Sequence, residues 1–363
     1  MSYNRAVPAI VVAIGMAACV GTPGEQTSEA RDTTAVALRP TVITDSVKHD
    51  TDDPAIWINF QDKSQSLILG TDKGGDGGDG ALYVFGLDGH EHKDKTVHGI
   101  KRPNNVDVAY GLILGSQRKD IAVCTERNTN SIRVFSLPEM KPIDSGGIGV
   151  FENDTARLPM GIALYTHGDH IYAIVSRKSG PSGSYLHQYR LDGKDGVVKG
   201  TLVRSFGEYS GKHEIEAVAV DNESGYVYYS DEGAGVRQYY AHPDSSNRQL
   251  GMFATSGFAD NHEGISIYKT DAVRGYIIVS DQQANQFQIF RREGTSTNPH
   301  DHQRVEVLKA STIESDGNEV TQVSLPGYPQ GFFIAMSDDK TFQIYPWTDV
   351  MKWLISRSVI SPQ

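Results

Sequence analysis

The chain has 363 residues, a formal net charge of −11 and a sequence pI near 5.5. A nucleic-acid interface or a polybasic membrane-docking segment requires a basic surface, so this charge balance argues against both. Length alone would allow two average domains, but large all-β folds also occur as single domains. The 37 glycines suit many short strands joined by tight turns.

The first 18 residues are predicted to be an export signal. Arg5 precedes an apolar run, Ala6 to Ala18, which at about 13 residues is too short to span a bilayer. The run ends in Met16-Ala17-Ala18-Cys19, which resembles a bacterial lipoprotein signal and predicts lipidation of Cys19. The alternative is ordinary signal cleavage with Cys19 incidental. Residues 19–35 are predicted to be a flexible tether, and the protein an outer-membrane lipoprotein, periplasmic or secreted.

A pattern of three strands recurs six times between residues 36 and 358. In each unit an alternating strand opens on polar residues, a second strand ends on a polar or charged pair, and a third carries aromatic residues. Equivalent positions lie 47 to 57 residues apart, near the roughly 40 to 50 residues of a four-stranded propeller blade. They are Ala55, Val106, Gly161, Ala217, Gly264 and Thr321. The pattern predicts an all-β fold, a six-bladed β-propeller in one domain, because a double sandwich would not give six near-equal units and a β-helix uses much shorter repeats.

Two segments fall outside the six units. Residues 40–44 have strand character and no unit of their own, so we expect a strand from the segment 35–47 to complete the last blade and close the ring. The first convincing amphipathic helix is predicted over residues 347–356.

Polar residues recur at equivalent strand ends. The innermost strand of each propeller blade runs along the central channel, so such positions gather at one end of one axis. The residues that open the first strands are Asp52, Asp53, Asn105, Asp107, Met160, Glu216, Glu263 and Glu319. The pairs that end the second strands are Asp72-Lys73, Glu126-Arg127, Arg177-Lys178, Asp231-Glu232, Asp281-Gln282 and Asp338-Asp339. Any one strand end is commonly polar, but all six together indicate a functional site.

The polar ends divide by charge. Blades four to six supply mainly carboxylates, whereas blades one to three supply Lys73, Arg127, Arg177 and Lys178. Closely packed carboxylates need a counter-charge, so a multivalent cation is expected, and oxygen ligands without His or Cys favour Ca²⁺ or Mg²⁺ over zinc. The basic residues fit a phosphate-rich anion. Metal ions facing fixed cations suit hydrolytic phosphoryl transfer.

Six motifs, in chain order from about Val42 to Trp353, resemble those of the bacterial β-propeller phytases. They are Thr51-Asp52-Asp53-Pro54-Ala55-Ile56-Trp57, Asn104-Asn105-Val106-Asp107, Ile215-Glu216, His262-Glu263-Gly264, Asp316-Gly317-Asn318-Glu319-Val320 and Met336-Ser337-Asp338-Asp339-Lys340-Thr341-Phe342. The resemblance implies a calcium-dependent, 3-phytase-like hydrolysis of phosphate monoesters of myo-inositol hexakisphosphate (phytate). Several Ca²⁺ ions would lie in a shallow cleft, where they would also reduce the repulsion between a polyanion and a protein of charge −11. We expect a monomer.

The resemblance also implies roles for individual residues. The ligands of the catalytic calcium cluster would be Asp52, Glu216, Asp231 and Glu263. Further calcium positions, or positions behind the ligands, would be Asp53, Asp107, Gln282, Asp316 and Asp338. The phosphate-binding cations would be Lys73, Arg127 and Lys178, and Arg177 is expected to assist them. The implied nucleophile is a water molecule activated by the metal ions, with no covalent phospho-enzyme.

Three positions depart from the family pattern. Met160 replaces the usual Tyr, Ala217 the common Gly, and Asn261 an acidic residue. These changes bear on the efficiency of phytate turnover more than on the fold. Two alternatives remain open: a propeller lactonase or other phosphoesterase with one central metal and no need for the three cations, and a non-catalytic binding propeller whose metals only stabilise it.

Overall fold

The structure, a computed structural model, describes residues 1, 37–75 and 77–357. The strands and helices described below all belong to one compact unit that begins at residue 37. Apart from Met1, the predicted export signal, Cys19 and the tether lie outside the described residues. No helix in the described ranges is long and apolar enough to cross a membrane.

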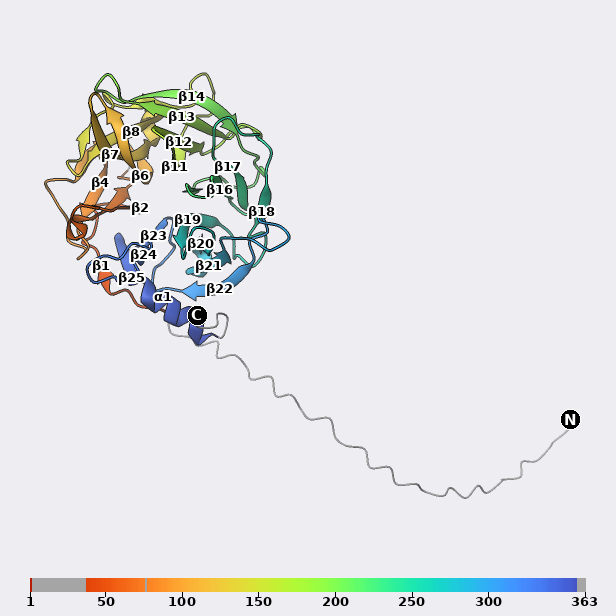
Figure 1. Cartoon of the computed structure of the whole chain (residues 1–363). Helices are drawn as coiled ribbons and strands as arrows, with labels where there is room; N and C mark the ends of the chain where they lie inside the picture. The colour runs from red at the N-terminus through yellow and green to blue at the C-terminus, as the bar shows by residue number, and fades with distance from the viewer. Residues whose placement is uncertain (2–36, 76, 358–363) are drawn as a thin grey trace. The chain divides into compact units, whose positions relative to one another are not determined.

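Six antiparallel sheets form the blades of a ring, which confirms the predicted six-bladed propeller (Figure 1). Blade one consists of β2 (Thr51–Trp57), β3 (Leu67–Asp72), β4 (Gly80–Phe85) and β5 (Val97–Ile100). Blade two consists of β6 (Pro103–Leu114), β7 (Gln117–Glu126), β8 (Ser131–Leu137) and β10 (Ile148–Gly149), with β9 (Lys141–Pro142) also paired to β8. Blade three consists of β11 (Pro159–His167), β12 (His170–Arg177), β13 (Leu186–Asp192) and β14 (Lys199–Phe206).

The second half of the ring has the same order, with the innermost strand first in the chain. Blade four consists of β15 (Val218–Asp221), β16 (Tyr226–Asp231), β17 (Gly235–Tyr240) and β18 (Gly251–Phe253). Blade five consists of β19 (His262–Lys269), β20 (Gly275–Asp281), β21 (Gln286–Arg291) and β22 (Arg304–Lys309). Blade six consists of β23 (Asn318–Thr321), β24 (Phe332–Ser337), β25 (Thr341–Pro346) and β1 (Val42–Ile43). Short 3-10 turns span Lys63–Gln65, Arg127–Thr129 and Gln282–Ala284.

The N-terminal strand closes the ring. β1 pairs antiparallel with β25, with Val42 opposite Ile344, so the last blade takes its outer strand from the start of the propeller (Figure 1). The expectation of a closing strand within residues 35–47 is therefore confirmed. Closure of this kind leaves no gap between the first and last blades.

The hydrophobic core is divided into six clusters, one between each pair of neighbouring blades. The expected helix, α1 (Trp347–Ser356), completes the cluster between blades five and six by burying Trp347, Val350 and Leu354. The Trp347 ring stacks on Tyr268 with ring centroids 3.7 Å apart. Each blade thus packs mainly against its neighbours, and the innermost strands leave a central channel.

A hydroxyl residue stands just before the strand-end pair in every blade: Thr71, Thr125, Ser176, Ser230, Ser280 and Ser337. In blades two to five this hydroxyl donates a hydrogen bond, 2.6–2.8 Å long, to a backbone carbonyl of the segment that opens the next blade. The ends of the second strands are therefore fixed to the starts of the neighbouring innermost strands, where the predicted site residues lie.

Candidate active site

Four innermost strands begin with the same β-bulge. In blade one Thr51 pairs with Asp72 and Pro54 pairs with Gly70, so β2 has one residue more than β3 between these pairs. The same shift occurs at the starts of β6, β11 and β19. The bulged pairs are Asp52-Asp53, Asn104-Asn105, Met160-Gly161 and Glu263-Gly264. A bulge re-aims side chains, and here the two residues of each pair have different surroundings.

The first residues of three blades meet through an amide. The Asn104 side chain donates hydrogen bonds to Asp52 Oδ2 at 2.7 Å and to Glu216 Oε1 at 3.3 Å, which joins blades one, two and four. Asp52 is only 1% exposed, and this burial raises its pKa to about 7 although the Lys73 charge opposes the shift. The blade-four strand has no bulge, but Glu216 just before it takes the equivalent place.

Six carboxylates lie around this point, and we call them the acidic cluster: Asp52, Glu214, Glu216, Glu232, Glu263 and Asp316. Glu214, Glu216 and Glu232 each offer an oxygen within 4.8 Å of the others. Burial raises the pKa values of Glu232 and Glu263, and the charges of neighbouring cluster members raise them further. Such carboxylates cannot all ionise together without a positive partner.

Several oxygens of the acidic cluster are buried and lack a hydrogen-bond partner among the described residues. They are Asp52 Oδ1, Glu232 Oε1 and Glu263 Oε2. A buried acceptor without a donor is costly, whereas carboxylate oxygens are the ligands that a hard divalent cation prefers. The donor set therefore fits calcium.

Three basic side chains border the acidic cluster, as the sequence predicted. Lys73 Nζ donates to Asp316 Oδ2 at 2.7 Å and lies 3.8 Å from Asp52 Oδ1. Lys178 Nζ lies 3.0 Å from Glu214 Oε2. Arg127 contacts the Met160 sulfur, and its charge opposes the upward pKa shifts of Asp52 and Glu216. The side-chain amide of Gln282 also lies at this border and donates a hydrogen bond to Asp316.

The structure corrects the assignment of Asp231 as a calcium ligand and catalytic residue. Asp231 is fully buried, and its carboxylate accepts hydrogen bonds from the backbone N–H and hydroxyl of Ser210 and from Arg237 Nε at 2.7–2.8 Å. The next residue, Glu232, joins the acidic cluster instead. Successive residues at a strand end point in opposite directions, and in blades one to five the second of each pair faces the site.

Arg177 is a second correction, for the same reason. Its side chain is 1% exposed, and its guanidinium donates to Asp154 Oδ2 at 2.6 Å and to the carbonyls of Ala156 and Ser184. A side chain that is buried and paired in this way cannot reach a substrate. Arg177 fixes the loop before β11, and Lys178 is the residue of this pair that borders the acidic cluster.

Asp338 does not join the acidic cluster. It lies at the exposed end of β24, and the contact that fixes it is the hydrogen bond from its backbone N–H to the Ile313 carbonyl at 3.0 Å. Blade six reaches the site through Asp316 instead, from the loop before β23. The assignment of Asp338 to the metal ligands is therefore not supported by its surroundings.

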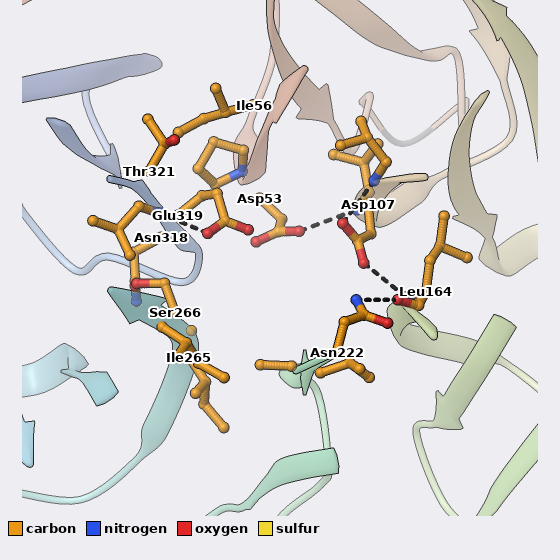
Figure 2. Close-up of a pocket in the computed structure, with 18 of the residues that line it drawn as sticks. Asp53, Ile56, Asp107, Leu164, Asn222, Ile265, Ser266, Asn318, Glu319 and Thr321 are labelled. Carbon is orange, nitrogen blue, oxygen red and sulfur yellow. Dashed lines mark hydrogen bonds between the residues drawn. The ribbon is translucent and has the colours of Figure 1, made fainter. Parts of the chain in front are cut away.

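Asp53 and Asp107 lie inside the channel rather than with Asp52 (Figure 2). They line a cavity of about 330 Å³ to which the innermost strands of all six blades contribute, and Glu319 shares it. Asp53 Oδ2 accepts the Val106 N–H at 3.1 Å. Asp107 Oδ2 accepts the Leu164 N–H at 2.7 Å. Each of these aspartates therefore joins its blade to the next one around the ring.

The channel carboxylates are also shifted toward the protonated form. Burial raises the pKa of Glu319 to about 8 and the pKa of Asp107 to about 6. Burial raises the pKa of Asp53 as well, with contributions from the neighbouring charges. One buried amide oxygen on the cavity lining, Asn105 Oδ1, has no hydrogen-bond partner within the described ranges. The channel thus offers a second group of oxygen ligands.

Comparison with known proteins identifies the family of this propeller. Its sequence matches are to phosphoric monoester hydrolases. A sequence model of the phytase family matches residues 4–353, and the chain belongs to this family. It is 26% identical over 324 residues to a protein named 3-phytase from Bacillus subtilis (strain 168), covering 84% of this chain and 81% of that protein. The solved structure titled "Structure of Dos1 propeller" is similar with a TM-score of 0.42 and 10% identity, covering 82% of this chain and 67% of that one.

Sequence reasoning missed two members of the acidic cluster. Glu232 was seen only as the second residue of a strand-end pair, and Glu214 lies in the loop before β15, where no strand pattern marks it. The row of hydroxyl residues was also missed. It is visible in the sequence, because Thr or Ser precedes every strand-end pair, and it would have fixed which residue of each pair turns inward.

Proposed function

We propose that this enzyme releases phosphate from myo-inositol hexakisphosphate in a calcium-dependent reaction at the acidic cluster. The observation that carries the proposal is that three basic side chains lie beside a group of buried carboxylates, several of whose oxygens lack a hydrogen-bond donor. Carboxylates alone would suit a structural cation, and the basic residues alone an anion. Their combination suits a polyanionic phosphate ester bound together with a cation.

Each residue has a distinct task in this proposal. Asp52, Glu216, Glu232 and Glu263 would hold calcium, and Asn104 orients the first two by its hydrogen bonds. Bound calcium would neutralise the carboxylates and the phosphoryl oxygens and would make water a better nucleophile at neutral pH. The Arg127 guanidinium is suited to hold two phosphate oxygens, and Lys73 and Lys178 act as point charges on the same group.

We propose a separate structural role for the channel. Asp53, Asp107 and Glu319 would hold another cation there, because their oxygens line one cavity and their charges oppose one another. A cation bound to carboxylates of three blades would stabilise the ring without touching substrate.

The expected location and assembly remain proposals as well. We propose an exported protein that acts as a monomer, anchored through Cys19 if the lipoprotein signal is used. The mass of the mature N-terminus measures this directly, since lipidation at Cys19 and plain signal cleavage give different masses.

The test of the proposed function is phosphate release from phytate with Ca²⁺ and again with a calcium chelator. The wild type should release phosphate only with Ca²⁺, and Glu216→Ala and Arg127→Ala should each lose at least about a hundredfold in kcat/KM. Glu139→Gln is a matched control, since it removes one carboxylate from a Glu–Lys pair remote from the site, 3.1 Å from Lys119 Nζ. No release by the wild type under calcium would reject the proposal, and full activity of both site variants would reject the site.

A further inference from the structure

Among the described residues, the Lys178 ammonium is paired with a single carboxylate, that of Glu214. Its Nζ lies 3.2 Å from Glu214 Oε1 and 3.0 Å from Oε2, with side-chain exposures of 46% for Lys178 and 24% for Glu214. The Lys178 backbone is fixed on both sides, because its N–H donates to the Leu158 carbonyl and its carbonyl accepts the Tyr185 hydroxyl. Only the lysine side chain is free to change partner.

Glu214 also belongs to the three-carboxylate group with Glu216 and Glu232, whose oxygens lie within 4.8 Å of one another. Glu232 is 2% exposed, and its Oε1 has no hydrogen-bond partner in the described part of the chain. Its backbone N–H donates to the Glu214 carbonyl at 3.1 Å, which keeps the two carboxylates together. A buried, unpartnered oxygen beside two further carboxylates is a place for a cation. Glu214 therefore stands between that place and Lys178.

We infer that Glu214 couples calcium to substrate binding. Without a cation, Glu214 neutralises Lys178 and keeps its ammonium from the substrate. When a cation binds Glu214, Glu216 and Glu232, the Glu214 charge is shared with the cation, and Lys178 is released to bind a phosphate group. This inference rests on the proposed function, and it assigns to Glu214 a positioning role that acts through Lys178.

The other two basic side chains differ from Lys178. Lys73 is also paired with a member of the acidic cluster, Asp316 at 2.7 Å, but it lies 3.8 Å from both Asp50 and Asp52 as well and is only 14% exposed. Arg127 is 9% exposed, and its Nε has no hydrogen-bond partner among the described residues. Both side chains are therefore largely buried, whereas that of Lys178 is not. Lys178 is half-exposed and tied to a single carboxylate, so it alone of the three can be switched in this way.

The reactivity of the Lys178 amine reports on its pairing. We would measure acetylation of Lys178 by mass spectrometry with Ca²⁺ and with a chelator, using an amine-reactive acetyl ester. In the wild type Ca²⁺ should raise the labelling rate about fivefold, the size expected when a half-exposed ion pair is lost. In Glu214→Gln labelling should be fast and should not respond to Ca²⁺. A wild-type rate at Lys178 that ignores Ca²⁺ would overturn the inference.

Binding of a sulfate analogue of phytate, inositol hexakissulfate, tests the consequence without turnover. In the absence of Ca²⁺, Glu214→Gln should bind this anion about fivefold more tightly than the wild type. The double variant Glu214→Gln/Lys178→Met should lose that gain, which separates release of Lys178 from a general change in charge. Titration with Ca²⁺ alone should show at least about a tenfold weaker site in Glu214→Gln.

Glu139→Gln serves as the control for charge, and melting temperatures check that each variant folds. Equal anion binding by Glu214→Gln and the wild type without Ca²⁺, or a gain that survives loss of Lys178, would overturn the inference. Because neither readout uses turnover, failure of the wild type to hydrolyse phytate would reject the proposed function and leave these results interpretable.

Discussion

The acidic cluster and the channel are built from neighbouring residues but differ in how their charges are satisfied. At the acidic cluster, several buried carboxylate oxygens lack hydrogen-bond donors and basic side chains lie beside them. In the channel, Asp53 and Asp107 accept backbone N–H groups of the next blade. Asp52 and Asp53 are adjacent in the chain and form one bulge, yet their side chains belong to different regions. The acidic cluster is therefore suited to bind a cation and a substrate, whereas the channel carboxylates are suited to hold neighbouring blades together.

The substitution Asp52→Asn should have the largest effect. It removes a charged ligand and its interaction with Lys73 while keeping the shape of the side chain. We expect kcat/KM for phytate to fall by about a thousandfold, with the melting temperature nearly unchanged. Steady-state kinetics and thermal unfolding in Ca²⁺ measure the two quantities. A strong loss of stability with little loss of activity would show that the two regions are not distinct.

The substitution Asp53→Asn should give the opposite result. Loss of a channel ligand should reduce the rise in melting temperature caused by Ca²⁺ by about 5 °C, since a ligand at a hundred times its Kd stabilises by about 2.7 kcal/mol. The value of kcat should stay within about threefold of the wild type. Thermal unfolding over a Ca²⁺ titration provides the measurement. If Ca²⁺ raises the melting temperature of Asp53→Asn as much as that of the wild type, no cation binds at Asp53 in the channel.

The stability of the calcium-free protein should depend on pH, with a smaller effect than either substitution. Glu319 has a pKa raised from 4.5 to about 8, and Asp107 has one raised from 3.8 to about 6. A raised carboxyl pKa means that the folded protein binds the proton more tightly. The stability from these groups is therefore present below pH 4 and is lost as pH rises through 6 to 8.

Thermal unfolding in a chelator across pH 4–8 measures this slope. Asp52 and other members of the acidic cluster shift in the same direction, so Glu319→Gln should flatten only part of the fall. Added Ca²⁺ should oppose the fall, since a cation favours the ionised carboxylates. A stability that rises with pH in the chelator would contradict the burial of these groups in protonated form.

The fold could be predicted because each unit repeats its strand periodicity, and even the closing strand followed from a segment with no unit of its own. The site was predicted at the level of residue groups. Asp52, Glu216, Glu263 and Lys73 lie together, as equivalent positions around a ring must.

The direction of individual side chains could not be predicted. Strand periodicity does not distinguish Asp231 from Glu232 as a ligand. The structure distinguishes them, because Ser210 in the loop after β14 and Arg237 in β17 donate hydrogen bonds to Asp231. The bulge at Asp52 and Asp53 similarly breaks the alternation on which strand arguments depend. Glu214 lies in a loop, where no periodicity exists to mark it.

The most direct test of the central claim is a crystal structure of the protein with Ca²⁺, in which anomalous diffraction locates the ions. The account predicts calcium bound by Asp52, Glu216, Glu232 and Glu263 at the acidic cluster, and a separate ion bound by Asp53, Asp107 and Glu319 in the channel. An enzyme that hydrolyses phytate while its acidic cluster holds no calcium would contradict the account.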